Sequence, residues 1–149
     1  MILKLNQNEQ IKEPEVQITY AQMNEEVERV ATFVRTLGTT IRCKSDGKET
    51  YIPAADIYYF ESVDKKSFVY CEKDVYQTEL RLYEIEEQLG SKGFARINKA
   101  CILNLAFLDS IRPLPSSRLE ATLKNDEKLF VSRKYLGEIK SILQRRSGL

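Results

Sequence analysis

Short stretches of alternating apolar and polar residues dominate the chain after residue 38, and this period of two predicts β-strands. Residues 39–45 and 48–52 flank Asp46-Gly47, a dipeptide that strongly indicates a tight hairpin turn. A turn at these two residues fixes the register of the hairpin. The expected facing pairs are Ile41 with Ile52, Cys43 with Thr50, and Lys44 with Glu49.

Further strands are predicted along the rest of the chain. Residues 56–62 are apolar on both faces, which is typical of a central strand that is covered on both sides. Residues 68–72 and 75–78 are expected to form a second hairpin over Lys73-Asp74. Alternation and turn residues predict the remaining strands over 94–97, 101–105, 108–112, 119–123 and 129–131.

Apolar residues at helical spacing predict three helices. The first follows Asn24, a favourable N-cap, and ends at Gly38. The second ends near Gly90, and the third follows a cap at Ser132. Their apolar faces consist of Val27, Val30, Val34 and Leu37 in the first helix, Leu82, Ile85 and Leu89 in the second, and Leu136, Ile139 and Leu143 in the third.

These elements divide the chain into an N-terminal β/α extension, residues 1–37, and a main domain, residues 38–149. The extension is predicted to contain a strand over 15–20, where residues alternate, and the first helix. Two interpretations of that helix's apolar stripe stay open: it packs on the main domain, or it contacts a second copy or a partner. The predicted fold class is α+β, predominantly antiparallel β, with two short helices in the main domain.

Composition narrows the class of protein. Hydrophobic residues make up 42% and charged residues 30%, which is typical of a globular chain. No apolar run approaches the ~18 residues that span a bilayer, and the N-terminus lacks a signal-peptide pattern, so we expect a cytosolic protein. Cys43, Cys71 and Cys101 lie far apart without a Cys-x-x-Cys pair, so neither a disulfide framework nor a zinc site is indicated.

Histidine is absent from the sequence. This removes Ser-His-Asp and Cys-His nucleophile pairs, histidine metal ligands and the usual proton shuttle. The glycine-rich loops that hold nucleotide phosphates do not occur either. The carboxylates of Asp56 and Glu61, or of Asp126 and Glu127, are better explained as strand-edge and turn residues. We therefore expect a protein that is not an enzyme, with no catalytic residues, metal, cofactor or small-molecule substrate.

The net charge is only +1, but it is unevenly distributed. Residues 1–37 carry four basic and six acidic side chains, and the remainder carries 19 basic and 16 acidic ones. The main domain is therefore mildly basic, which is compatible with a nucleic-acid partner and also common in proteins that have none.

Four blocks of the main domain resemble, in order and spacing, the motifs of one family. An apolar strand ending in a glutamate, within 57–62, precedes the polar stretch 64–66, and residues 81–89 resemble the family's central helix. Residues 94–104 read Phe-Ala-Arg-Ile-Asn-Lys-Ala-Cys-Ile-Leu-Asn, and residues 131–136 read Val-Ser-Arg-Lys-Tyr-Leu. Together the blocks cover about residues 39–146, and they resemble the LytTR family of bacterial transcription regulators.

This resemblance implies an elongated fold of small antiparallel sheets whose loops reach successive major grooves of double-stranded DNA and bend it. Carried over by position, the contacting residues form three clusters: Lys65, Lys66 and Ser67; Asn98 and Lys99; Arg133 and Lys134. Ala100 stands where the family usually has serine, and Asn98 stands where histidine is frequent. The preferred DNA sequence is therefore expected to differ from that of other members.

The chemistry of the third cluster points in the same direction. Ser132, Arg133 and Lys134 lie at a predicted helix N-terminus, where free N–H groups and the helix dipole favour an anion such as phosphate. Two cations there are unfavourable unless an anion binds. The alternative is that Ser132 only caps the helix and that the residues of the other two clusters lie in ordinary, solvated turns. Arg96 alternates with apolar residues, so we expect it to pair with a carboxylate.

The resemblance also implies partners. A single small module binds DNA weakly, so a homodimer on repeated promoter half-sites is expected. The ~37 residues before the main domain are too few for a receiver domain, so control by phosphorylation of this chain is not expected. Stand-alone members are often paired with a small membrane protein that restrains them. The main rival hypothesis is a protein-interaction module whose loops bind another protein and never DNA.

Overall fold

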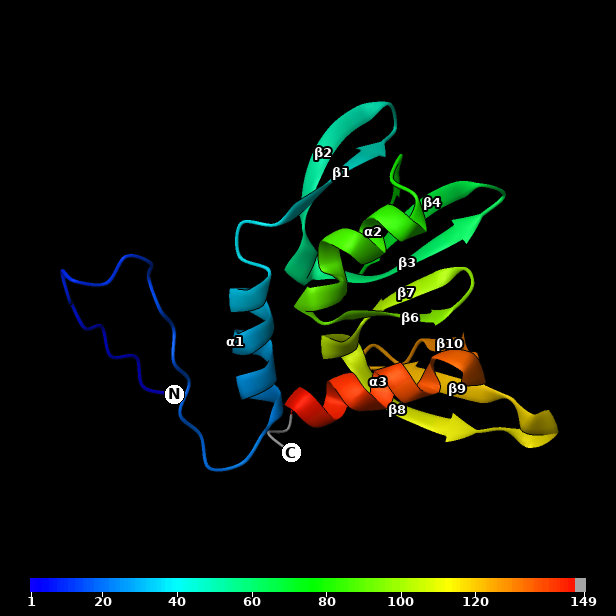
Figure 1. The fold of residues 1–149 in the computed structure, drawn as a ribbon. Helices are drawn as coiled ribbons and strands as arrows, with labels where there is room; N and C mark the ends of the chain where they lie inside the picture. The colour runs from blue at the N-terminus through cyan, green and yellow to red at the C-terminus, as the bar shows by residue number, and fades with distance from the viewer. Residues whose placement is uncertain (147–149) are drawn as a thin grey trace.

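The computed structural model describes residues 1–146, which form two antiparallel sheets and three α-helices (Figure 1). The strands of the larger sheet are β1 (Thr40–Ser45), β2 (Lys48–Pro53), β3 (Ile57–Val63), β4 (Lys66–Cys71), β5 (Val75–Thr78), β6 (Phe94–Asn98) and β7 (Cys101–Asn104). The strands of the smaller sheet are β8 (Leu108–Pro113), β9 (Leu119–Leu123) and β10 (Lys128–Val131). The helices are α1 (Glu25–Arg35), α2 (Leu82–Leu89) and α3 (Arg133–Arg146).

The strand order of the larger sheet is β2-β1-β5-β4-β3-β7-β6, and that of the smaller sheet is β10-β9-β8. The antiparallel α+β class predicted from the sequence is thereby confirmed. The predicted register of the first hairpin is also confirmed, with Ile41 opposite Ile52 and Cys43 opposite Thr50. Both turn residues, Asp46 and Gly47, have positive φ, as a two-residue turn of the right twist requires.

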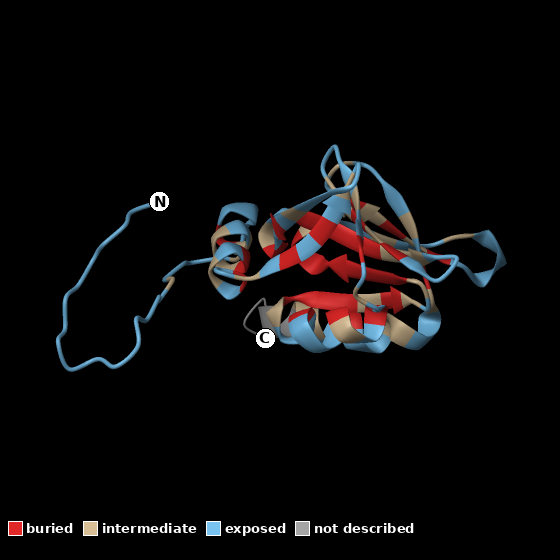
Figure 2. Ribbon diagram, turned by 90° about the horizontal axis from the view of Figure 1, so that it is seen from above, coloured by how far each residue is buried: buried red, intermediate tan, exposed pale blue. Residues whose placement is uncertain are grey.

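β3 lies between β4 and β7 and is covered on both faces, as its apolar sequence predicts. Ile57 and Phe60 belong to a core that the larger sheet forms with α2. Tyr58 and Tyr59 belong to a second core, shared with the smaller sheet and α3. In Figure 2 the buried residues accordingly lie along the strands, between the layers of the molecule. The two cores hold the sheets and both helices of the main domain together.

α3 covers the smaller sheet and the end of the larger one. Its residue Ile139 is fully buried, while Leu136 and Leu143 are half-buried against the same core. The predicted apolar face of this helix is therefore confirmed. The backbone N–H of Ser132 donates to the carbonyl oxygen of Ile97 at 2.8 Å, which fixes the start of α3 beside the end of β6.

α1 begins as predicted, because the side chain of Asn24 accepts a hydrogen bond from the N–H of Val27 at 2.9 Å. Val27 is buried, so the apolar stripe does pack on the main domain at this end of the helix. At the other end Leu37 is 66% exposed. Gly38 follows with a φ of +78°, a conformation that glycine adopts without strain. An ion pair of 3.6 Å between Glu28 and Lys124 adds a second attachment.

Residues 1–23 form an extended arm that lies apart from the body of the molecule (Figure 2). The strand predicted over 15–20 is wrong, because these residues pair with no other strand of the described chain. Alternation shows which side chains a strand would bury, but a strand forms only where a sheet edge supplies hydrogen bonds. The N-terminal extension is therefore an arm followed by a helix.

No helix within residues 1–146 has both the length and the apolar character needed to cross a membrane.

Candidate nucleic-acid interface

Three turns lie along one edge of the molecule, at the right of Figure 1. They are the β3–β4 turn, the β6–β7 turn, and the segment that leads from β10 into α3. The loop between β8 and β9 lies at the same edge. Each turn carries one of the three clusters predicted from the sequence, so residues up to about 70 positions apart in the chain are brought to one side.

Backbone hydrogen bonds join the three turns at their bases. The N–H of Ser62, near the end of β3, donates to the carbonyl oxygen of Ala100 in the β6–β7 turn at 2.8 Å. The bond from Ser132 to Ile97, also 2.8 Å, joins the β6–β7 hairpin to the start of α3. Because both bonds join backbone groups, they link the turns whatever side chains stand at these positions.

The β3–β4 turn presents two lysines to solvent. Asp64 and Lys65 are its central residues, with φ of +51° and +66°, and Lys66 is the first residue of β4. Both lysine side chains are exposed, as the sequence predicts for a polar hairpin loop. The two-residue turn makes this hairpin narrow, and a two-stranded ribbon of this kind is small enough to enter a DNA major groove.

Arg81 is a residue of this edge that sequence reasoning did not select. It precedes α2, and its guanidinium donates to the carbonyl oxygen of Lys65 at 3.2 Å. Its backbone N–H donates to a carboxylate oxygen of Glu84 at 3.0 Å, and this bond anchors Arg81 at the start of the helix. An exposed arginine thus both supports the β3–β4 turn and adds a positive charge beside it. No local motif signals this role, since the contact joins residues that are 16 positions apart.

Ser67 does not belong to the exposed surface, and here the sequence-based assignment requires correction. Ser67 is only 5% exposed, and in the sheet it stands opposite Ser62 of β3 on one side and Thr78 of β5 on the other. The hydroxyl of Ser67 therefore cannot reach a duplex in this conformation. Ser67 is buried because it shares a face of β4 with Val69, which belongs to the core formed with α2.

Asn98 is engaged within the protein. Its Nδ2 donates to the carbonyl oxygen of Phe130 at 2.8 Å, and its Oδ1 accepts from the N–H of Ala100 at 2.8 Å. The first bond connects β6 with β10, and the second shapes the β6–β7 turn. The side chain that was expected to contact DNA thus holds the turn that presents Lys99, whose side chain is exposed.

Arg96 supports the same turn from below. Its guanidinium donates to the carbonyl oxygen of Lys99 at 2.6 Å and forms an ion pair with Glu86 of α2 at 3.3 Å. The predicted carboxylate partner is therefore confirmed. The side chain of Arg96 is largely buried, and its Nε has no hydrogen-bond partner in the described structure. These contacts tie the β6–β7 turn to α2.

Arg133 and Lys134 form the exposed start of α3. The Nε of Arg133 donates to the carbonyl oxygen of Ser117 at 3.1 Å, which ties the β8–β9 loop to the helix start. The ammonium of Lys134 lies 5.4 Å from the ring centroid of Tyr135, within the range of a cation–π contact. Arg118, next to Ser117, is exposed at the same place, although the sequence alone did not select it.

The edge therefore combines exposed cations with a rigid frame. We call it the basic edge and define it by Lys65, Lys66, Lys99, Arg133 and Lys134. It is not a helix-turn-helix, because within residues 1–146 five strands separate α1 from α2 and five separate α2 from α3. Turns and one helix start, instead of a recognition helix, present the side chains.

The sequence profile of the LytTr DNA-binding domain matches residues 47–144. The chain belongs to the LytTR family. This family is defined by DNA binding and is not a class of enzymes. The profile begins within the predicted main domain, and the boundary at residue 38 stays a prediction.

Relatives and solved structures agree with the LytTR assignment. The chain is similar to an uncharacterized HTH-type transcriptional regulator of Staphylococcus aureus strain MSSA476, with 29% identity over 95% of this chain and 99% of the relative. A similar protein of strain NCTC 8325 is 29% identical over 95% of each chain. A solved LytTr DNA-binding domain from Bacillus cereus superposes with a TM-score of 0.64 and 25% identity, over 70% of this chain and 95% of that one.

Proposed function

We propose that this LytTR protein regulates transcription by binding specific sequences of double-stranded DNA through the basic edge. The observation that carries the proposal is the geometry of that edge: five exposed cations lie on three turns whose bases are joined by backbone hydrogen bonds. Because the relatives that align over nearly the whole chain are named transcriptional regulators, regulation is the expected outcome of binding.

The affinity of such a complex comes from phosphate contacts. Each lysine or arginine that neutralises a phosphate releases a condensed counterion, and this gain does not depend on the DNA sequence. Lys65, Lys66 and Lys134 suit this role because they are exposed point charges. The N-terminus of α3 adds free N–H groups and the positive end of the helix dipole beside Lys134.

The sequence preference requires contacts with base edges and a deformable duplex. In our proposal the β3–β4 turn and the β6–β7 turn enter successive major grooves, where Lys99 and Arg133 reach bases, and the DNA bends around the edge. Each base contact is worth ~1–3 kcal/mol of discrimination. Ser67 is omitted because it is buried, and Asn98 is assigned to holding the β6–β7 turn.

The oligomeric state and partners follow from the small size of this edge. A single module of this kind binds weakly, so we propose that two copies act as a homodimer on repeated promoter half-sites. Chromosomal DNA as the ligand implies a cytosolic protein. A small membrane protein that restrains the regulator, as the family resemblance implies, is the proposed source of control.

The decisive experiment is selection of bound duplexes from a random pool, followed by affinity measurements against salt. If six phosphates are neutralised, the slope of log K against log salt is expected to be about −5. Lys73→Ala is the matched control for substitutions of lysines on the basic edge, because Lys73 is an exposed lysine in the turn at the opposite end of β4. No enriched sequence together with a flat salt dependence would overturn the proposal and favour the rival protein-interaction module.

A further inference from the structure

The N-terminal arm carries a large share of the exposed apolar surface. Among the described residues, half of the large hydrophobic side chains that are exposed lie between residues 1 and 23. They are Met1, Ile2, Leu3, Leu5, Ile11, Val16 and Tyr20. So many exposed apolar side chains in one short segment indicate an interaction site, because leaving them in water is unfavourable.

The backbone of the arm also forms few hydrogen bonds with other backbone groups of the described chain. The described structure records one backbone–backbone hydrogen bond within residues 1–23, from the N–H of Ile11 to the carbonyl oxygen of Asn8 at 3.2 Å. The terminal amino group of Met1 lies 3.8 Å from a carboxylate oxygen of Glu26, so the arm leaves α1 and returns to it as an open loop. Within this loop, residues 15–20 alternate as an edge strand does.

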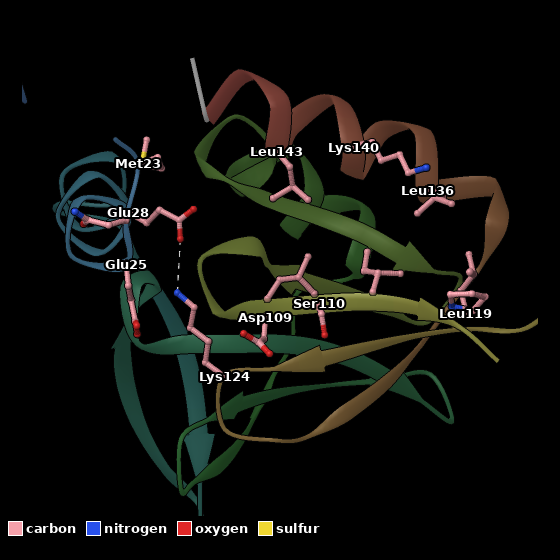
Figure 3. Close-up of a pocket in the computed structure, with 14 residues that line it drawn as sticks. Met23, Glu25, Glu28, Asp109, Ser110, Leu119, Lys124, Leu136, Lys140 and Leu143 are labelled. Carbon is pink, nitrogen blue, oxygen red and sulfur yellow. Dashed lines mark ion pairs between the residues drawn. The ribbon is translucent and has the colours of Figure 1, made fainter. Parts of the chain in front are cut away.

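A sheet edge that lacks a neighbouring strand lies close to the point where the arm begins. β8 is the outer strand of the smaller sheet and pairs only with β9. Beside it, α1, β8 and α3 enclose a cleft of about 640 Å³ (Figure 3). The apolar side chains of Leu108, Ile111, Leu136 and Leu143 line this cleft.

The arm and the cleft complement each other in length and polarity. Residues 15–20 and β8 each contain six residues. Val16, Ile18 and Tyr20 would share one face of a strand, which matches the apolar lining of the cleft.

We propose that residues 15–20 of one copy add as a strand to β8 of a second copy, and that the exchange is reciprocal. A second copy is favoured over the chain's own cleft because the Met1–Glu26 contact holds the arm as a loop on the far side of α1 from β8. Reciprocal exchange also suits a two-fold dimer, because the arm of each copy then contacts β8 of the other.

This exchange specifies the homodimer of the proposed function but does not depend on DNA contact, so it is tested without DNA. Light scattering of the full chain at micromolar concentration should give twice the mass of one chain. The variant Val16→Asp with Ile18→Asp should be monomeric, because it places two carboxylates on the apolar face. The matched control, Gln17→Asp with Thr19→Asp, adds the same charge to the opposite face of the segment and should stay dimeric.

Hydrogen exchange locates the contact on the partner. The amides of residues 108–113 should be protected in the natural chain and in the control, and they should exchange at least tenfold faster in the monomeric variant. A monomeric natural chain, with or without protection of β8, would overturn the exchange. So would a dimer that the apolar-face variant leaves intact, or one whose arm-dependent protection falls on another strand. Loss of DNA binding in a chain that remains an exchanged dimer would count only against the proposed function.

Discussion

The side-chain amide of Asn98 donates to the carbonyl oxygen of Phe130 across 2.8 Å and so joins the two sheets of the molecule. The same side chain accepts a hydrogen bond from Ala100 within the β6–β7 turn. One residue thus couples the shape of a turn on the basic edge to the strand that leads into α3. This coupling separates residues that hold the edge from those that would contact DNA.

Asn98→Ala is expected to lower the free energy of unfolding by about 1–3 kcal/mol, because the N–H of Ala100 and the carbonyl oxygen of Phe130 lose their partner. Lys99→Ala should leave stability within about 0.5 kcal/mol, since its side chain is exposed. Urea unfolding of both variants checks this. Equal stability of the two would show that the Asn98 bonds contribute little.

Lys134→Ala should weaken specific DNA binding by roughly 1–3 kcal/mol without unfolding the protein. The reason is loss of one cation at the start of α3, where the helix dipole already favours phosphate. Affinity measured at several salt concentrations should also show a slope smaller by about 1. Lys73→Ala should behave like the natural chain, and unchanged binding by Lys134→Ala would remove this residue from the interface.

Arg81→Gln tests whether the β3–β4 turn is supported from α2. The substitution removes the charge and the hydrogen bond to the carbonyl oxygen of Lys65, so affinity for DNA should fall by about 1 kcal/mol or more. Hydrogen exchange should at the same time become faster in the β3–β4 turn. If affinity falls while the exchange of the turn is unchanged, Arg81 contacts DNA and does not position the turn.

Deletion of residues 1–37 should leave DNA affinity but alter assembly, because the three turns of the basic edge lie outside the deleted segment. The deletion exposes the surface that Val27 covers, so some loss of stability is expected. Circular dichroism and a DNA-binding titration of the truncated chain provide the measurement. A truncated chain that cannot fold would show that α1 is part of the core and that the boundary at residue 38 is wrong.

Stability at alkaline pH should depend on Cys43. Burial raises the pKa of its thiol to about 11, so the folded protein holds this proton more tightly than the unfolded chain. The contribution is complete below the unfolded pKa, near 9, and is lost as pH rises from there through about 11. It amounts to at most about 3 kcal/mol. Between pH 8 and 11, the free energy of unfolding measured with urea should fall less steeply for Cys43→Ala than for the natural chain. An identical dependence on pH in the two proteins would contradict a raised pKa of the Cys43 thiol.

The main-domain strands could be predicted because their signals are local. Asp46-Gly47 fixes the register of the first hairpin by its own conformation, and the strand over 56–62, apolar on both faces, requires cover on both sides. The strand over 15–20 was wrong because alternation contains no information about a partner edge.

The candidate site was predictable only in part, for a related reason. The exposure of Lys65, Lys66 and Lys99 follows from their place in turns. The burial of Ser67 depends on the core that covers its face of β4, and the engagement of Asn98 depends on a carbonyl group 32 residues away. Sequence position can bring a residue to an edge, but contacts between distant segments decide which atoms remain free.

The backbone bonds from Ser62 to Ala100 and from Ser132 to Ile97 have a consequence for how this protein can evolve. Neither bond depends on the identity of a side chain, so substitutions of the exposed lysines at the tips of the turns leave both bonds in place. A lineage can therefore acquire a new operator by exchanging a few tip residues while the same scaffold is inherited intact.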